Sequence, residues 1–135
     1  MRAIFYNSHF NGDISTWNVA RVTDMSLMFA STAAFNGDIS TWNVARVTDM
    51  YSMFAWAAAF NGDISTWNVA RVTDMGNMFY SAKSFKRSLC RAAWFNSKAD
   101  KTDVFYGSSG SISKSPCTTT TTTTGINVDS VLSVR

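Results

Sequence analysis

Residues 10–25 read FNGDISTWNVARVTDM, and the same sixteen residues recur unchanged at 35–50 and 60–75, an interval of 25. Nine variable residues complete each repeat, SLMFASTAA, YSMFAWAAA and GNMFYSAKS in turn. A period of about 20–29 residues is too short for two helices per unit, which need about 33 or more, and fits one strand-plus-helix unit. The repeat therefore decides the fold.

The apolar residues change their spacing along each repeat. Trp17 and Val19 alternate with polar neighbours, as in a short β-strand. From Met25, the spacing to Met28 and Phe29 is that of one face of a helix. The sequence therefore predicts an α/β repeat solenoid of leucine-rich-repeat-like coils, each with one short strand plus one short helix, about four coils in all.

Local signals complete this expected unit. Thr23 or Asp24 is placed to cap the helix. Gly12, in Asn-Gly-Asp, predicts a return turn with a positive φ. Because stacked repeats bury one continuous core, we expect six positions and their equivalents to face inward. These are Phe10, Trp17, Val19, Val22, Met25 and Phe29.

Polar residues that recur at the same position of each repeat predict columns of identical side chains on the surface. The candidate binding columns are Thr16, Thr41, Thr66, Asn18, Asn43, Asn68, Arg21, Arg46 and Arg71. The asparagines suit an amide ladder. Stacked aspartates, such as Asp13 and Asp38, need compensating charge, and we favour the arginines over calcium because Arg and Asp repeat together. A binding site is expected on one such column or where the repeats differ.

Composition argues against several classes of function. The 135 residues are 46% hydrophobic and carry a net charge of +3, with one histidine, His9. No apolar run approaches 18 residues, so no membrane span is expected. Basic residues gather after residue 84 but form no run, which argues against nucleic-acid binding. Without a base beside a nucleophile, and with identical carboxylates in every repeat, the sequence predicts neither an enzyme nor a cofactor.

The chain divides into four expected segments. Residues 1–9 resemble a partial N-terminal coil, 10–84 are the three repeats, and 85–117 resemble a degenerate capping coil. Residues 118–135 begin with seven threonines and read as a Thr-rich linker and disordered tail. The chain starts within a coil and has no signal peptide, so we interpret it as a fragment whose open end favours end-to-end self-association.

The two cysteines, Cys90 and Cys117, leave three readings open. A disulfide would close a loop of about 28 residues and stabilise the cap by about 3–4 kcal/mol. Two free thiols would suit a cytosolic chain. A metal site would need two further soft ligands, which the sequence lacks.

The pattern I-x-x-W-x-V-x-x-V-x-x-M-x-x-M-F followed by F-N-G-D-I-S resembles the BspA-like leucine-rich-repeat family over residues 1–117. The match is to its 25-residue branch, first catalogued as a mycoplasma repeat of unknown function. The resemblance implies an extracellular or cell-surface module for adhesion, with an unidentified protein or glycan partner and no catalytic residues. It also implies an oxidising compartment, in which Cys90 and Cys117 are expected to pair. The alternative function is a purely structural spacer or stalk.

Overall fold

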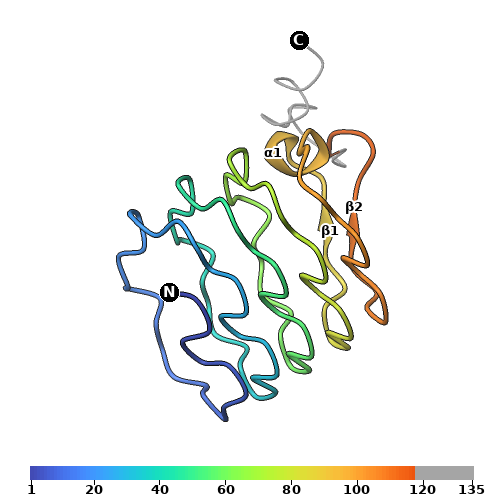
Figure 1. Cartoon of the computed structure of the whole chain (residues 1–135). Coiled ribbons are helices and arrows are strands. Elements are labelled where there is room, and N and C mark those ends of the chain that lie inside the picture. Colours follow the sequence, from blue (N-terminus) through green and yellow to red (C-terminus); the bar gives the residue numbers. More distant parts are fainter. Residues whose placement is uncertain (118–135) are drawn as a thin grey trace, which may run out of the picture.

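The structure is a computed structural model that describes residues 1–117 (Figure 1). Its regular elements are β1 (Ser88–Leu89), α1 (Ala92–Phe95) and β2 (Ser111–Ile112). The two strands form one parallel sheet. The expected linker and tail, 118–135, lie outside the described residues. No helix among the described residues is both long and apolar enough to cross a membrane.

The prediction of an α/β solenoid is wrong. Within residues 1–117 there is one helix of four residues and one sheet of two two-residue strands, and all three elements follow residue 87. The repeats at 10–84 consist of turns and isolated bridges instead, so the four strand-plus-helix coils are not present.

Consecutive tight turns replace the helix expected from Met25 onward. The N–H of Met28 donates to the carbonyl of Met25 at 3.3 Å, and that of Ala30 donates to Leu27 at 3.2 Å. These are bonds to the third preceding residue, not the fourth as in an α-helix. Leu27 and Ser31 have φ angles of 60° and 56°, and a left-handed residue stops a helix from propagating. Apolar residues spaced three apart share one face of this run of turns, as they would share one face of a helix.

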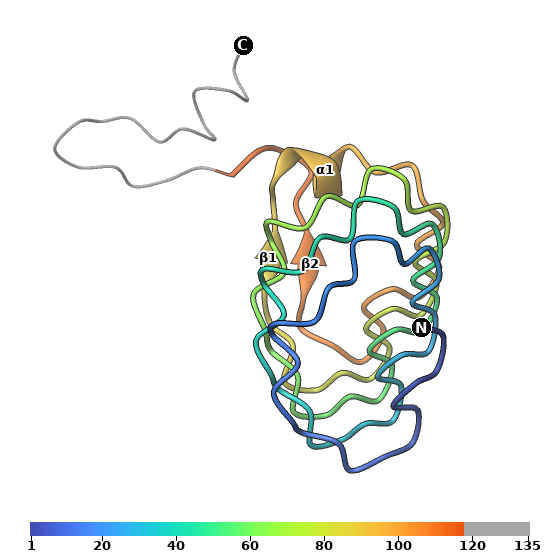
Figure 2. The ribbon, with the colours of Figure 1, turned by 90° about the vertical axis from the view of Figure 1, so that its left-hand side faces the viewer.

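Most of the remaining N–H groups of this segment bond to the next repeat, and that of Ser26 bonds to the side chain of Asp24. Met25 donates to the carbonyl of Asp49 and Leu27 to that of Tyr51, both at 2.9 Å. The same pattern links each repeat to its successor, and Figure 2 shows successive repeats following nearly the same outline. Parallel bridges run from Asp24 to Asp49 and onward through the equivalent aspartates. Helical bonding would use these N–H groups internally, so the contact between repeats outcompetes the helix.

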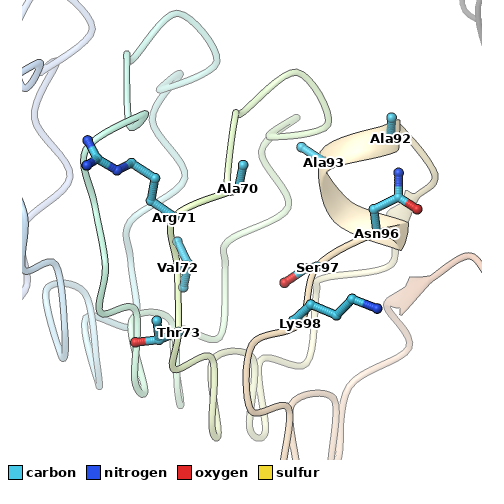
Figure 3. Close-up of a pocket in the computed structure, with 9 residues that line it drawn as sticks. All are labelled: Ala70, Arg71, Val72, Thr73, Ala92, Ala93, Asn96, Ser97 and Lys98. Atoms are coloured by element: carbon cyan, nitrogen blue, oxygen red, sulfur yellow. The ribbon is translucent and has the colours of Figure 1, made fainter.

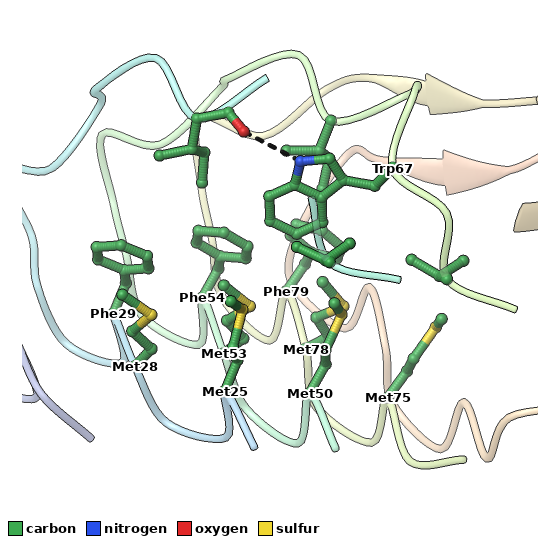
Figure 4. Packing of buried hydrophobic residues seen from close by; sticks show 14 of the residues in the cluster. Met25, Met28, Phe29, Met50, Met53, Phe54, Trp67, Met75, Met78 and Phe79 are labelled. Carbon is green, nitrogen blue, oxygen red and sulfur yellow. Dashed lines mark hydrogen bonds between the residues drawn. The ribbon is translucent and has the colours of Figure 1, made fainter. Parts of the chain in front are cut away.

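Aromatic rings stack from repeat to repeat in the core (Figure 4). Phe54 lies between Phe29 and Phe79, with ring centroids 5.5 Å apart on both sides. A second column, through Phe35 and Phe60, packs against the first with centroids about 4 Å apart. Of the positions expected to face inward in the first repeat, Val19, Met25 and Phe29 are buried, whereas Phe10 and Val22 are half-buried.

The tryptophans add a hydrogen bond between repeats. The indole N–H of Trp67 donates to the carbonyl of Ile39 at 3.0 Å (Figure 4), and Trp42 donates to Ile14 over the same distance. Trp17 has the same sequence around it but is 39% exposed, although its ring contacts that of Phe5 with centroids 5.7 Å apart, so the expectation that it faces fully inward is wrong.

Close packing, not a positive φ, requires the repeated glycine. Among residues 1–117 the only glycine with a positive φ is Gly107, so the prediction for Gly12 is wrong. A Cβ on Gly37 would lie 2.8 Å from the ring of Phe35, and one on Gly12 would lie 2.9 Å from Phe10. Each phenylalanine ring folds back over the glycine two residues later, and only a hydrogen fits beneath it.

The segment after residue 84 continues the stack. Trp94, on α1, continues the tryptophan column by donating to the carbonyl of Ile64 at 3.2 Å. The bridge ladder continues from Asp74 to Asp100. These two residues are 26 apart, one more than the interval between the repeats. Cys90 and Cys117 form a disulfide with Cα atoms 4.8 Å apart, in agreement with the pairing expected from the sequence.

Candidate functional site

All of the candidate column residues are exposed. This holds for Thr16, Thr41, Thr66, Asn18, Asn43, Asn68, Arg21, Arg46 and Arg71. The side chains of several of them are hydrogen-bonded to the backbone. The side-chain oxygen of Asn18 accepts a hydrogen bond from the N–H of Ala20 at 3.1 Å, and the equivalent asparagines do the same. These are Asx turns, so this column fixes a turn in its own repeat and does not form the expected amide ladder.

A different asparagine column links the repeats. The side-chain oxygen of Asn11 accepts from the N–H of Asn36 at 3.2 Å, and that of Asn36 accepts from Asn61 at 2.9 Å. Asn61 in turn accepts from the N–H of Lys86 at 3.1 Å. Sequence reasoning missed this column, because periodicity alone does not show which of two repeated asparagines points along the stack.

The repeated aspartates are also bound locally. Asp38 accepts from the N–H and the hydroxyl of Ser40, at 3.0 and 2.6 Å. These hydrogen bonds lower the pKa of the Asp38 carboxyl, although the charges of Asp13 and Asp63 act in the opposite direction. Hydrogen bonds from the equivalent serine lower the pKa of Asp13 in the same way. The carboxylates are therefore parts of turns.

Basic residues outside the three repeats act on two of the repeated aspartates. At Asp63, hydrogen bonds from Ser65 lower the pKa most, and the charges of Arg87 and Arg91 lower it further. At Asp24, burial raises the pKa, but bonds from Ser26 and the charge of Arg2 outweigh it. The favoured pairing of the aspartates with Arg21, Arg46 and Arg71 stays a prediction. Among residues 1–117 no three His, Cys, Asp or Glu side chains gather as metal ligands.

One surface hollow lies between the last full repeat and α1 (Figure 3). Its volume is about 420 Å³, and its walls include Ala70, Val72 and Ala93. It has two cationic residues, Arg71 and Lys98, but Figure 3 shows their side chains directed away from each other. A binding site for an anion needs cations that converge on one point, and this hollow does not provide them.

A second hollow, of about 310 Å³, crosses the turns of successive repeats. We call it the aromatic hollow. It is lined by Tyr6, Leu27, Ala30, Ser31, Ser52, Ala55, Trp56, Asn77 and Tyr80. Tyr6 and Trp56 are 55% and 54% exposed, which is unusual for such large rings. Small side chains from the repeats between them leave room for the hollow.

An aromatic row continues from this hollow along the stack. The rings of Trp56 and Tyr80 have centroids 5.8 Å apart, and those of Tyr80 and Tyr106 are stacked at 4.9 Å. Backbone bonds fix the row, since Trp56 donates to the carbonyl of Tyr80 and Ser81 to that of Tyr106. Aromatic rings of consecutive repeats thus lie against one another in a row.

Sequence reasoning did not name the aromatic hollow, although a signal for it was present. The hollow takes its Leu27, Trp56 and Asn77 from the nine-residue variable blocks, where a binding site was expected to differ between repeats. Within each block the lining positions are three and four residues apart, as in Leu27, Ala30 and Ser31, and that spacing places them on one face.

Comparison with known families gives one result. The family model described as a mycoplasma protein of unknown function, DUF285, matches residues 1–116. No curated protein and no solved structure matches the chain.

Proposed function

We propose that this chain, which belongs to the DUF285 family of mycoplasma proteins of unknown function, is a non-enzymatic binding module. In this proposal the module belongs to a cell-surface or secreted protein, holds a protein or glycan partner, and serves adhesion. The resemblance of its repeats to BspA-like surface proteins favours the same class of function.

One observation carries the proposal: exposed aromatic side chains occupy positions at which otherwise identical repeats differ. Trp56 stands where the preceding repeat has Ser31, and Tyr51 stands where it has Ser26. Both rings are exposed. Large exposed aromatic residues do not contribute to the core and mark interaction surfaces.

The alternative, a structural spacer, accounts for the shared residues only. The phenylalanine and tryptophan columns and the backbone ladder suffice for a rigid rod. A rod needs no aromatic row on its outside. The binding module therefore explains more of the sequence than the spacer does.

The disulfide supports placement outside the cytosol. Cytosolic thiols are kept reduced, whereas disulfides persist on cell surfaces and in secreted proteins. Cys90 and Cys117 form a disulfide in this structure. Self-association of the chain stays a prediction, and light scattering on the purified protein tests it.

A binding screen with two matched double variants tests the proposal. The purified chain is applied to immobilised matrix proteins and to a glycan array. Trp56→Ser with Tyr80→Ser should abolish binding, whereas Thr41→Ala with Arg46→Ala, on the candidate columns, should preserve it. If the column variant alone loses binding, the columns are the site. If the unmodified chain binds none of the surfaces, the spacer is the better account.

A further inference from the structure

The aromatic hollow offers a ligand three things: ring faces, small polar groups and no charge. Trp56 and Tyr6 supply exposed rings. Ser31, Ser52 and Asn77 supply polar groups. None of the lining residues is ionisable near neutral pH. Charged ligands are thus not favoured here over neutral ones.

The backbone beneath the hollow is not available to a ligand. Ser31 donates its N–H to the carbonyl of Ala55, and Trp56 donates its own to that of Tyr80, both at 2.8 Å. A peptide that binds by adding a strand needs free N–H and C=O groups along an edge. Such a peptide finds none at these positions, so the side chains must hold the ligand.

Pyranose sugars match this combination. A pyranose ring has one or both faces lined by C–H bonds, which suit the electron-rich face of an indole or phenol ring. Its hydroxyl groups donate and accept hydrogen bonds around the rim. Asn77 uses its Nδ2 to contact the Tyr51 hydroxyl at 3.3 Å, which leaves its amide oxygen able to accept.

Two separate exposed rings at the hollow, Tyr6 and Trp56, favour more than one sugar unit. Tyr80 and Tyr106 stack on each other with centroids 4.9 Å apart, so the ring faces between them are closed to a sugar. We propose that the aromatic hollow binds a neutral oligosaccharide, with one pyranose ring against Trp56 and a second against Tyr6. This inference rests on the proposed function, because it names the class of partner held at the same surface.

Titration of the ¹⁵N-labelled chain with cellotetraose, mannotetraose and chitotetraose, followed by NMR, tests the inference. We expect at least one of these probes to shift the indole N–H signal of Trp56 and leave that of the buried Trp67 in place. Trp56→Ala should weaken the binding of that probe by about tenfold or more. Trp17→Ala is the matched control, since Trp17 is also exposed but lies outside the hollow, and it should bind as the unmodified chain does.

Three outcomes would overturn the inference. They are the absence of any shift with all three probes at about 10 mM, an equal loss of binding in both variants, and preferential binding of a sulfated oligosaccharide. The proposed function fails separately. If these sugars do not bind but the Trp56 and Tyr80 double variant still loses binding to a matrix protein, the module is a binder whose partner is not a neutral glycan.

Discussion

The indole nitrogen of Trp67 lies 3.0 Å from the carbonyl oxygen of Ile39, one repeat earlier, and donates a buried hydrogen bond to it. Trp67→Phe would keep an aromatic ring but remove this bond and leave space where the larger indole was, and the Ile39 carbonyl would keep the N–H of Trp42, at 3.2 Å, as a donor. We expect a loss of about 1–3 kcal/mol in the free energy of unfolding, measured by urea denaturation.

Trp17→Phe is the control for this variant. The surrounding sequence is the same, but Trp17 is 39% exposed and water can replace its hydrogen bonds. Its loss should be markedly smaller. Equal losses at the two positions would show that the bond to Ile39 contributes nothing specific.

The glycine beneath each phenylalanine ring gives a second prediction. Gly37→Ala places a methyl group 2.8 Å from the ring of Phe35, which is fully buried and cannot move aside. We expect destabilisation of about 1–3 kcal/mol. Gly12→Ala should cost less, because Phe10 is only half-buried and its ring can shift. The order of the two thermal midpoints checks this, and a reversed order would contradict it.

The disulfide gives a third prediction, which concerns the capping segment. Reduction of the Cys90–Cys117 bond should lower the free energy of unfolding by about 3 kcal/mol, since the bond joins residues 27 apart. Denaturation with and without dithiothreitol measures this loss. The double variant Cys90→Ser, Cys117→Ser should show no response to the reductant. A response in that variant would assign the effect to something other than the disulfide.

Acid should weaken the fold through the turn aspartates. Hydrogen bonds from Ser40 hold the pKa of Asp38 below its ordinary value of 3.8, and those from Thr102 do the same for Asp100. A lowered pKa in the folded state adds stability above the unfolded value, and that stability is lost as the pH falls through the folded value. The thermal midpoint should therefore fall as the pH drops below about 4.

Asp38→Asn checks the origin of this acid effect. The amide oxygen of asparagine can still accept from Ser40, but the side chain has no carboxyl to protonate. The variant should lose less stability than the unmodified chain between pH 7 and about pH 2. An identical pH profile in the two proteins would show that Asp38 takes no part.

The sequence identified the repeat, its interval and most of the buried residues, because a strict period leaves few choices for the core. It did not reveal the local backbone. Met25, Met28 and Phe29 are spaced for a helix, yet Leu27 adopts a left-handed conformation and its N–H bonds to the next repeat. That competition depends on a neighbour 24 residues away, so no local propensity could show it.

The backbone ladder joins successive repeats through the same pair of hydrogen bonds each time. The N–H groups of Met25 and Met50 donate to the carbonyls of Asp49 and Asp74 in the later repeat, and the N–H groups of Thr48 and Thr73 donate back to the carbonyls of Thr23 and Thr48 in the earlier one. Successive repeats are therefore joined by the same hydrogen-bond pattern. A whole 25-residue unit can be gained, lost or moved without leaving backbone groups unpaired at the new interface. The variable blocks travel with their units. In this way the order of aromatic and small residues on the outer face can be rewritten in steps of one repeat while the interior stays unchanged.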